Sequence, residues 1–304
     1  MYGSIFNTTV VPGGPNLIKD ARAPRVFFVD SNGGGSTTSG GLTPASAFTT
    51  IDSAIGACTA NRGDIIYVLA GHVETLAAAA AIAADVAGIS IIGLGNGTDR
   101  PTLTLSATDS TIAVSAANIT FQNLVIISSV NELVKVFNIT AAYCTIDAVD
   151  VKDNGSAKEI LQFALTTNAA DFLTIKNCYH VQLTAGATVQ RWIYLVGTES
   201  VRILNNTFIL KLNDIATACV ISADGDSRLT EIGGNRIHLT GYTANLVSAV
   251  IGASGATGIH YDGRYYCDTT ITTTINDTQS MPSFEVYCSN DLDKNAILDP
   301  VVGS

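Results

Sequence analysis

The stretches LTIKNCYH, at residues 173–180, and VRILNNTF, at residues 201–208, decide the fold of this chain. Each has apolar residues at its first and third positions and Asn at its fifth, and the two lie 28 residues apart. Alternation of this kind is typical of a β-strand with one buried face. Asn tolerates the left-handed backbone conformation, which allows a strand to turn a sharp corner. Each stretch therefore predicts a short strand followed by a corner.

The same pattern recurs along most of the chain. Its central apolar residue appears seven times at spacings of 25 to 30 residues, as Ile91, Phe121, Ile146, Ile175, Ile203, Ile232 and Tyr261. The residue two places later is Gly or Asn in six of these seven copies. A second apolar run follows in most copies, and no helical pattern separates the copies. We therefore predict a parallel β-helix with about three short strands in each turn, and eight or so turns between Ile65 and Thr272.

A β-sandwich is the alternative all-β fold for a chain rich in short strands. Nothing in a sandwich requires one turn residue to recur in the same register six times. The composition also favours the β-helix, because only 14% of the 304 residues are charged. Stacked strands place equivalent residues about 4.8 Å apart, where outward charges would face like charges, whereas Thr, Ser and Asn can form ladders.

Composition excludes several classes of protein. With 47% hydrophobic residues, the chain is not intrinsically disordered. The longest apolar run, residues 76–84, is too short to span a membrane. The formal net charge is −10 and no stretch gathers Lys and Arg, so we expect no nucleic-acid partner. The N-terminus has no secretory signal pattern, and no cofactor or metal site is expected from the residues.

Residues 25–76 resemble the entry segment of a known superfamily. They contain VDSN at 29–32, GLTP at 41–44, AFTTI at 47–51 and GDIIYV at 63–68, with an amphipathic helix near residues 50–59 that begins after Thr50. This order resembles the pectin-lyase-like right-handed parallel β-helix superfamily. The resemblance implies a single-stranded, right-handed β-helix whose short N-terminal helix caps the open apolar end. It is specific for the fold and weak for function.

Three regions follow from this interpretation. Residues 1–24 contain Pro and Gly without periodicity and are predicted to form an extended N-terminal arm. Residues 25–272 form the β-helix with its capping helix, and residues 273–304 form a C-terminal cap or tail. The six cysteines have no C-x-x-C spacing, so most are predicted to be buried thiols, with their disulfide state left open.

Catalytic candidates are few. The paired motifs of polygalacturonase-like members are missing, and the nearest fragments are residues 235–238 and 224–226. Asp147, Asp150 and Asp153 form the densest carboxylate group, which we interpret as surface side chains rather than a calcium site. Residues 224–228, DGDSR, are interpreted as a charged turn. No catalytic, cofactor-binding or metal-binding residue is therefore predicted.

Histidines and aromatic residues give no clear site either. His72, His180, His238 and His260 lie far apart in the sequence, His180 takes an apolar position of the repeat, and His260 is predicted to point outward. Trp192 lies in an apolar strand, and Tyr261, Tyr265 and Tyr266 form a C-terminal cluster. We interpret these rings as core or end-cap packing, with ligand stacking as the alternative.

A weakly charged β-helix without a catalytic constellation resembles the β-helix proteins that tailed bacteriophages carry on their particles. The leading hypothesis is a non-enzymatic virion structural protein, either a capsid decoration protein or a tail-spike or fibre module. Residues 1–24 would attach it to other virion proteins, and self-association, with a trimer as one form, is expected. The expected location is the virion, with an extracellular protein as the alternative.

Two other functions remain open. One is a polysaccharide lyase or glycoside hydrolase, which would need residues such as Asp150, Lys176 and Arg202 to converge from neighbouring turns. The other is a carbohydrate-binding adhesin module that holds a surface glycan through Trp192 or Tyr265.

Overall fold

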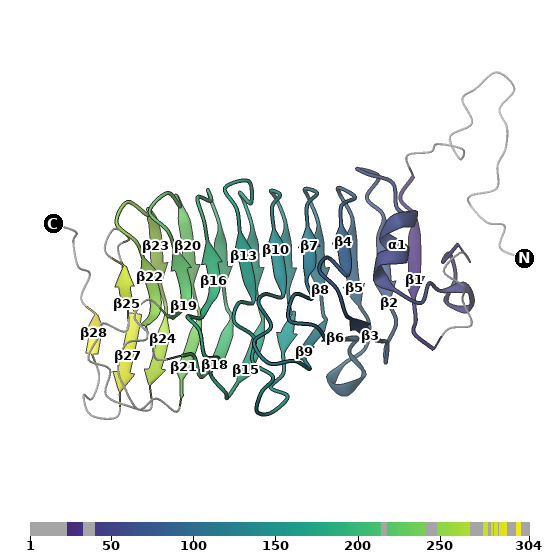
Figure 1. The fold of residues 1–304 in the computed structure, drawn as a ribbon. Coiled ribbons are helices and arrows are strands. Elements are labelled where there is room, and N and C mark those ends of the chain that lie inside the picture. Colours follow the sequence, from purple (N-terminus) through teal and green to yellow (C-terminus); the bar gives the residue numbers. More distant parts are fainter. Residues whose placement is uncertain are drawn as a thin grey trace, which may run out of the picture.

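A computed structural model describes residues 23–32, 40–213, 218–240, 248–267, 276–278, 281, 283–284, 286–290 and 296–298. In these residues the chain winds into a column in which successive strands stack along one axis (Figure 1). The predicted parallel β-helix is confirmed. Except for its last two residues, the predicted arm (1–24) lies outside the described residues.

Three parallel sheets form the walls of the column, and we call them A, B and C in the order in which each turn visits them. Sheet A holds β1 (Val26–Val29), β2 (Ile65–Val68), β5 (Ser90–Gly93), β8 (Thr120–Gln122), β11 (Thr145–Asp147), β14 (Thr174–Lys176), β17 (Arg202–Leu204), β20 (Thr230–Gly233), β23 (Gly258–Tyr261) and β26 (Ser283–Phe284).

Sheet B lies one corner further along each turn. It holds β3 (Val73–Leu76), β6 (Thr102–Leu105), β9 (Val125–Ser128), β12 (Asp150–Val151), β15 (Tyr179–Gln182), β18 (Thr207–Leu210), β21 (Arg236–Leu239), β24 (Arg264–Cys267), β27 (Val286–Asn290) and β28 (Ala296–Leu298). Sheet C holds β4 (Ile82–Ala84), β7 (Ile112–Val114), β10 (Phe137–Ile139), β13 (Ala164–Thr166), β16 (Arg191–Leu195), β19 (Cys219–Ala223), β22 (Ser248–Gly252) and β25 (Asn276–Thr278).

The predicted register holds for six of the seven repeat copies. The central residues from Ile91 to Ile232 pair in one unbroken row across sheet A. The seventh copy is shifted by one residue, because Ile232 pairs with His260 and not with Tyr261. A one-residue shift exchanges the two faces of a strand. His260 is therefore buried and Ile259 is 40% exposed, which corrects the prediction that His260 points outward.

The N-terminal end is closed by α1 (Ile51–Ala57), which lies beside β1, β2 and β4 (Figure 1). The predicted N-cap of this helix is confirmed, since the Thr50 side chain accepts a hydrogen bond from the backbone N–H of Ser53. Asp52 accepts a hydrogen bond from the N–H of Ala83 at 2.8 Å, which occupies a donor at the first strand of sheet C. The 3-10 turns η1 (Pro44–Ser46) and η2 (Gly97–Asp99) complete the described helices.

Aromatic rings run along the middle of the core. Phe121, Phe137 and Phe163 pack edge to face with centroids 5.3 and 5.4 Å apart. His180 continues this row between Phe163 and Phe208. Its Nε2–H donates to the carbonyl oxygen of Val149, and its Nδ1 accepts from the indole N–H of Trp192 at 2.7 Å. Burial lowers the pKa of His180 to about 3, so the ring stays neutral.

At the far end of the column, β28 pairs antiparallel with β27, in contrast to the parallel pairs before it. The prediction of buried thiols is confirmed for Cys144, Cys178 and Cys219, while Cys58 is partly exposed at the end of α1, and all four are free thiols. The side chains of Cys267 and Cys288 lie outside the described residues.

Candidate functional site

The aromatic residues singled out in the sequence belong mainly to the core. Trp192 is fully buried, and Tyr265 is 2% exposed with its hydroxyl hydrogen-bonded to His260. Neither buried ring offers a face to a ligand, so ligand stacking, the alternative interpretation, does not apply to these two residues. Tyr266 is 42% exposed and packs edge to face on His238. The packing interpretation therefore holds for Trp192 and Tyr265.

The three aspartates of the densest carboxylate group do not converge. Asp147 belongs to sheet A, where it pairs with Lys176 at 3.5 Å and accepts a hydrogen bond from Asn177. Asp150 lies across the corner in sheet B, forms an ion pair with Arg100 and accepts the N–H of Tyr179. Asp153 is exposed. The described residues contain no group of three or more His, Cys, Asp or Glu side chains that could hold a metal ion.

The residues proposed for a lyase or hydrolase are held by separate partners. Asp150 pairs with Arg100, Lys176 with Asp147, and Arg202 with Glu231 at 2.6 Å. Tyr261 also donates to Glu231 at 2.7 Å. The Tyr261 hydroxyl, together with Arg202, holds the pKa of Glu231 below its usual range although burial opposes this shift. The pairs of Lys176 and Arg202 join outward side chains of sheet A, while the pair of Asp150 with Arg100 involves sheet B.

The remaining histidines also have structural partners. His72 is buried, its Nδ1 accepts the N–H of Ser31, and its Nε2 lies 3.2 Å from a carboxylate oxygen of Glu74. The same oxygen accepts the first N–H of α1, from Ile51. His72 and Glu74 therefore fasten the entry segment to the capping helix.

Two columns of left-handed residues border sheet A. The A–B corner, between sheets A and B, consists of Asn123, Ala148, Asn177, Asn205, Gly234 and Asp262, all with φ between 46° and 65°. The C–A corner, between sheets C and A, consists of Gly63, Gly88, Asn118, Tyr143, Phe172, Ser200 and Leu229, all with φ between 51° and 78°. The five consecutive turns from β8 to β20 contribute one residue to each column, so the two columns run along the axis on either side of sheet A.

The C–A corner carries an exposed aromatic pair. Tyr143 and Phe172 occupy successive turns, 54% and 44% exposed, and their rings stack in parallel with centroids 4.6 Å apart. A left-handed conformation costs an ordinary L-residue about 1–2 kcal/mol, and for a bulky side chain it is an outlier. Ser200 follows in the next turn, so the face of Phe172 turned away from Tyr143 meets no further ring. Strain and exposure therefore coincide at this pair.

A polar hollow of about 440 Å³ adjoins the same corner. It is lined by residues that flank the corner positions in consecutive turns: Asn168, Asp171, Gly197, Thr198, Glu199, Asp226 and Arg228. The Thr198 side chain is buried, and its hydroxyl has no hydrogen-bond partner among the described residues. The polar groups that a ligand in the hollow can reach are therefore the exposed side chains around it, such as those of Asn168, Glu199 and Arg228. In the predicted charged turn at residues 224–228, the Asp224 carboxylate has a structural role. It accepts hydrogen bonds from the N–H of Gly197 and from the Ser227 hydroxyl.

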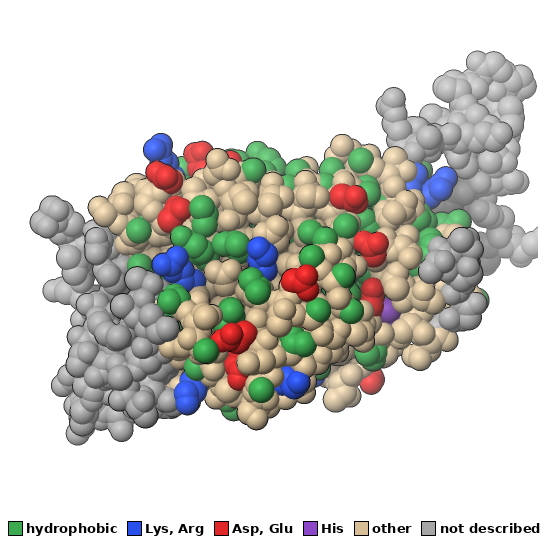
Figure 2. All heavy atoms as spheres, in the orientation of Figure 1, with side chains coloured by type: hydrophobic (Ala, Val, Ile, Leu, Met, Phe, Trp, Pro, Cys, Tyr) green, Lys and Arg blue, Asp and Glu red, His purple; other side chains and the backbone are tan. Residues whose placement is uncertain are grey.

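These features determine which kind of ligand the C–A corner could bind. Exposed ring faces can bury the apolar C–H faces of a ligand, and the adjoining hollow offers an amide, carboxylates and a guanidinium for hydrogen bonds. Figure 2 shows that charged side chains are scattered over one face of the column and do not gather into a patch. The corner is therefore suited to a neutral, hydroxyl-rich ligand with apolar faces.

The sequence carries a signal for this site that the candidate residues above do not include. The corner residue stands three places before each central residue of the repeat, and the column reads Gly88, Asn118, Tyr143, Phe172, Ser200 and Leu229. Gly and Asn at the first two turns mark a left-handed position. Bulky residues rarely adopt the left-handed conformation that this position requires. Tyr and Phe in the column therefore indicate a role other than forming the corner.

Comparisons with known proteins support the fold. No family model and no curated protein matches the chain. A rhamnogalacturonan lyase structure aligns with a TM-score of 0.50 and 13% identity, over 86% of this chain and 73% of the lyase. YbhC of Escherichia coli aligns with a TM-score of 0.41 and 12% identity, over 89% of this chain and 86% of YbhC.

At 13% identity, the similarity to the lyase indicates a shared fold and says nothing about function. Among the described helices, none has the length and apolar character needed to cross a bilayer. The chain is a parallel β-solenoid with distant structural similarity to a rhamnogalacturonan lyase.

Proposed function

We propose that this protein is a carbohydrate-binding β-solenoid that holds a glycan at the C–A corner without cleaving it. The observation that carries the proposal is the stacked, half-exposed pair Tyr143 and Phe172 at strained backbone positions. Strain that persists at a surface indicates a functional constraint, because the fold itself would be better served by Asn or Gly at these positions. Pyranose rings present apolar C–H faces to aromatic rings and hydroxyl groups to polar neighbours, and the corner supplies both kinds of partner.

The adjoining hollow supports the same proposal. Its polar lining, with the Asn168 amide, three carboxylates and the Arg228 guanidinium, would bind the hydroxyl groups of a sugar whose apolar face lies on Phe172. Cleavage is the weaker alternative, since Asp150, Lys176 and Arg202 are each held by a different partner. Because the hollow carries three carboxylates and one guanidinium, neutral oligosaccharides are the first probes. A rhamnogalacturonan lyase shares the fold, so oligosaccharides of that acidic polymer serve as the second probe.

Binding to a glycan array and to rhamnogalacturonan oligosaccharides tests the proposal. Phe172→Asn removes the ring and keeps a residue that tolerates the left-handed backbone, so we expect binding to weaken at least tenfold while the fold is retained. Tyr179→Asn is the matched control, because Tyr179 is similarly exposed, at 48%, but lies in sheet B. Binding that survives Phe172→Asn, or release of shortened oligosaccharides by the wild-type protein, would contradict the proposal.

The virion hypothesis stays a prediction, because its attachment arm lies almost wholly outside the described residues. A mass-spectrometric inventory of purified particles tests it. Detection of the chain at a fixed copy number would support the hypothesis, and its absence from particles would contradict it.

A further inference from the structure

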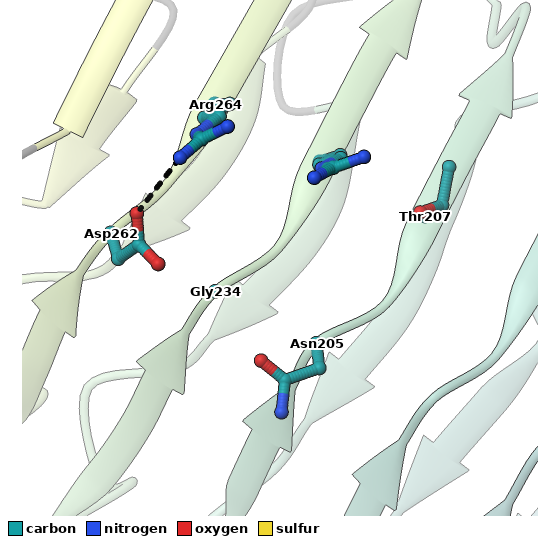
Figure 3. Close-up of a pocket in the computed structure, with 6 residues that line it drawn as sticks. Asn205, Thr207, Gly234, Asp262 and Arg264 are labelled. Atoms are coloured by element: carbon teal, nitrogen blue, oxygen red, sulfur yellow. Dashed lines mark ion pairs between the residues drawn. The ribbon is translucent and has the colours of Figure 1, made fainter.

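A second hollow, of about 370 Å³, lies at the A–B corner, one sheet width away from the aromatic pair. Two rows of three residues line it, one from the corner itself and one from the strands that follow it. The corner row is Asn205, Gly234 and Asp262, and the strand row is Thr207, Arg236 and Arg264. Figure 3 shows Asn205 and Asp262 on either side of Gly234, with Asp262 directed toward Arg264. We call this hollow the arginine notch.

The strand register sets the spacing of the two guanidinium groups. Arg236 pairs with Thr207 on one side and with Arg264 on the other. Adjacent parallel strands lie about 4.8 Å apart, and residues that pair in register point to the same side of the sheet. The notch therefore presents two arginine side chains in parallel, one turn apart.

Gly234 makes room for the side chain of Asn205. A Cβ atom at this position would lie 2.3 Å from Oδ1 of Asn205, which is well inside contact distance. The φ of Gly234 is +65°, so glycine also suits the backbone there. The Asn205 amide therefore lies against Gly234 at the floor of the notch, where a larger residue would displace it.

The charges in the notch are not balanced. Arg264 lies 3.9 Å from Asp262, and both side chains are more than half exposed, so their attraction is weak. Arg236 forms no ion pair with any described residue. Like charges directly opposite each other on neighbouring strands destabilise a sheet. This arrangement, in a chain with a net charge of −10, calls for an anion from outside.

We infer that the arginine notch binds an oxyanion: a carboxylate, sulfate or phosphate group of a ligand. Guanidinium groups match such anions because their planar N–H donors can hold two oxygens at once. Two guanidinium groups one turn apart can each donate to a different oxygen of the same anion, while Thr207 and Asn205 offer further hydrogen bonds. This inference does not depend on the proposed glycan site at the C–A corner.

Titration with simple anions tests the inference on the full-length protein. We would follow the Nε–Hε signals of the arginine side chains by nuclear magnetic resonance while adding sodium sulfate, methyl phosphate or glucuronate, at ionic strength held constant with chloride. The anion that binds most tightly identifies the class of ligand. Glucose is the neutral control, and we expect no shift of these signals when glucose is added.

Three variants separate binding from structure. Arg236→Gln should weaken anion binding about tenfold or more, because it removes a charge-assisted pair of donors. Asp262→Asn should strengthen binding several-fold, because it removes the competing carboxylate and keeps a residue that tolerates a positive φ. Arg202→Gln, in the middle of sheet A, should leave anion binding unchanged.

Two results would overturn the inference. The first is equal binding of the anions by the wild-type protein and Arg236→Gln. The second is an affinity that does not rise in Asp262→Asn, since a purely structural role of Asp262 predicts no gain. Failure of these tests would leave glycan binding at Tyr143 and Phe172 unaffected, so the two proposals can fail separately.

Discussion

The two corners that border sheet A face the same backbone requirement and meet it with different residues. In the five turns from β8 to β20, both place one residue of each turn in the left-handed conformation. The A–B corner uses mainly Asn and Gly, which take that conformation at little cost. The C–A corner begins in the same way and then uses Tyr143, Phe172 and Leu229, which do not. This difference separates residues that serve the fold from residues that the fold merely tolerates.

The side chains next to the two corners also differ. Next to the A–B corner, Asn206 is fully buried, and its Oδ1 accepts the N–H of Cys178 at 3.0 Å. Its Nδ2 donates to the carbonyl of Ile175 and to Oδ1 of Asn235. This internal amide ladder pairs backbone groups that the sharp turn would otherwise leave without partners. At the C–A corner, by contrast, Tyr143 and Phe172 direct large side chains outward.

Breaking the amide ladder should have the largest effect. Asn206→Leu keeps the approximate volume but leaves the N–H of Cys178 and the carbonyl of Ile175 buried without this partner. We expect the free energy of unfolding to fall by about 3 kcal/mol, measured by urea denaturation followed by circular dichroism. Asn205→Gly, at the exposed neighbour, is the control and should change stability by less than about 0.5 kcal/mol. Equal losses in the two variants would show that the ladder has no special role.

Acid should weaken the A–B corner next. His180 donates to Val149 beside this corner, and its pKa of about 3 lies below the 6.5 of the unfolded chain. Its contribution is therefore fully present above pH 6.5 and is lost as the pH falls toward 3, because only the unfolded state gains the proton. Between pH 7.5 and 4.5 this group alone should remove about 2–3 kcal/mol. His180→Phe should show a smaller loss over the same interval, and an identical loss would refute this assignment.

Changing the aromatic pair should have a smaller effect of the opposite sign. Replacing both Tyr143 and Phe172 by Asn relieves two strained positions and removes one ring stack, which contributes about 0.5–1.5 kcal/mol. Relief of about 1–2 kcal/mol at each position outweighs that loss. We expect the free energy of unfolding to rise by about 1 kcal/mol while glycan binding is lost. A marked loss of stability would mean that these rings serve the fold after all.

Leu229→Asn should give the smallest change. Leu229 is 61% exposed, so little packing is lost, and its φ of 51° suits Asn better. An increase of about 0.5 kcal/mol in the free energy of unfolding is expected. The same denaturation assay, compared with Asn118→Ala, which introduces strain into the same column, should show shifts of opposite sign.

The sequence was sufficient to predict the repeat, the capping helix and the A–B corner, because each depends on local signals: alternation, an N-cap at Thr50, and Asn or Gly at a fixed place. It was not sufficient where tertiary contacts override the pattern. The last copy slips by one residue because His260, and not Tyr261, is buried beside Tyr265. No local signal distinguishes these two registers, since Ile259 and Tyr261 fit the alternation equally well.

The site was harder to predict than the fold. Trp192 was a reasonable aromatic candidate, yet it is buried because its indole N–H finds an acceptor in His180, 12 residues earlier in the chain. Tyr143 and Phe172 read as ordinary aromatic residues in the linear sequence. Their proximity follows only from the register that places successive turns on top of one another.

That register gives the column the properties of a graduated ruler. Each turn adds one division of about 4.8 Å along the axis and presents one position at each corner. Phe172 stands two divisions before Leu229, whose turn also carries Gly234 of the arginine notch. Each hollow spans three successive turns, and the two hollows share the divisions at which Ser200 and Leu229 stand. Inserting one whole turn between these two shared divisions would therefore split both hollows at once, so the number of turns in the column cannot change there without altering both surfaces together.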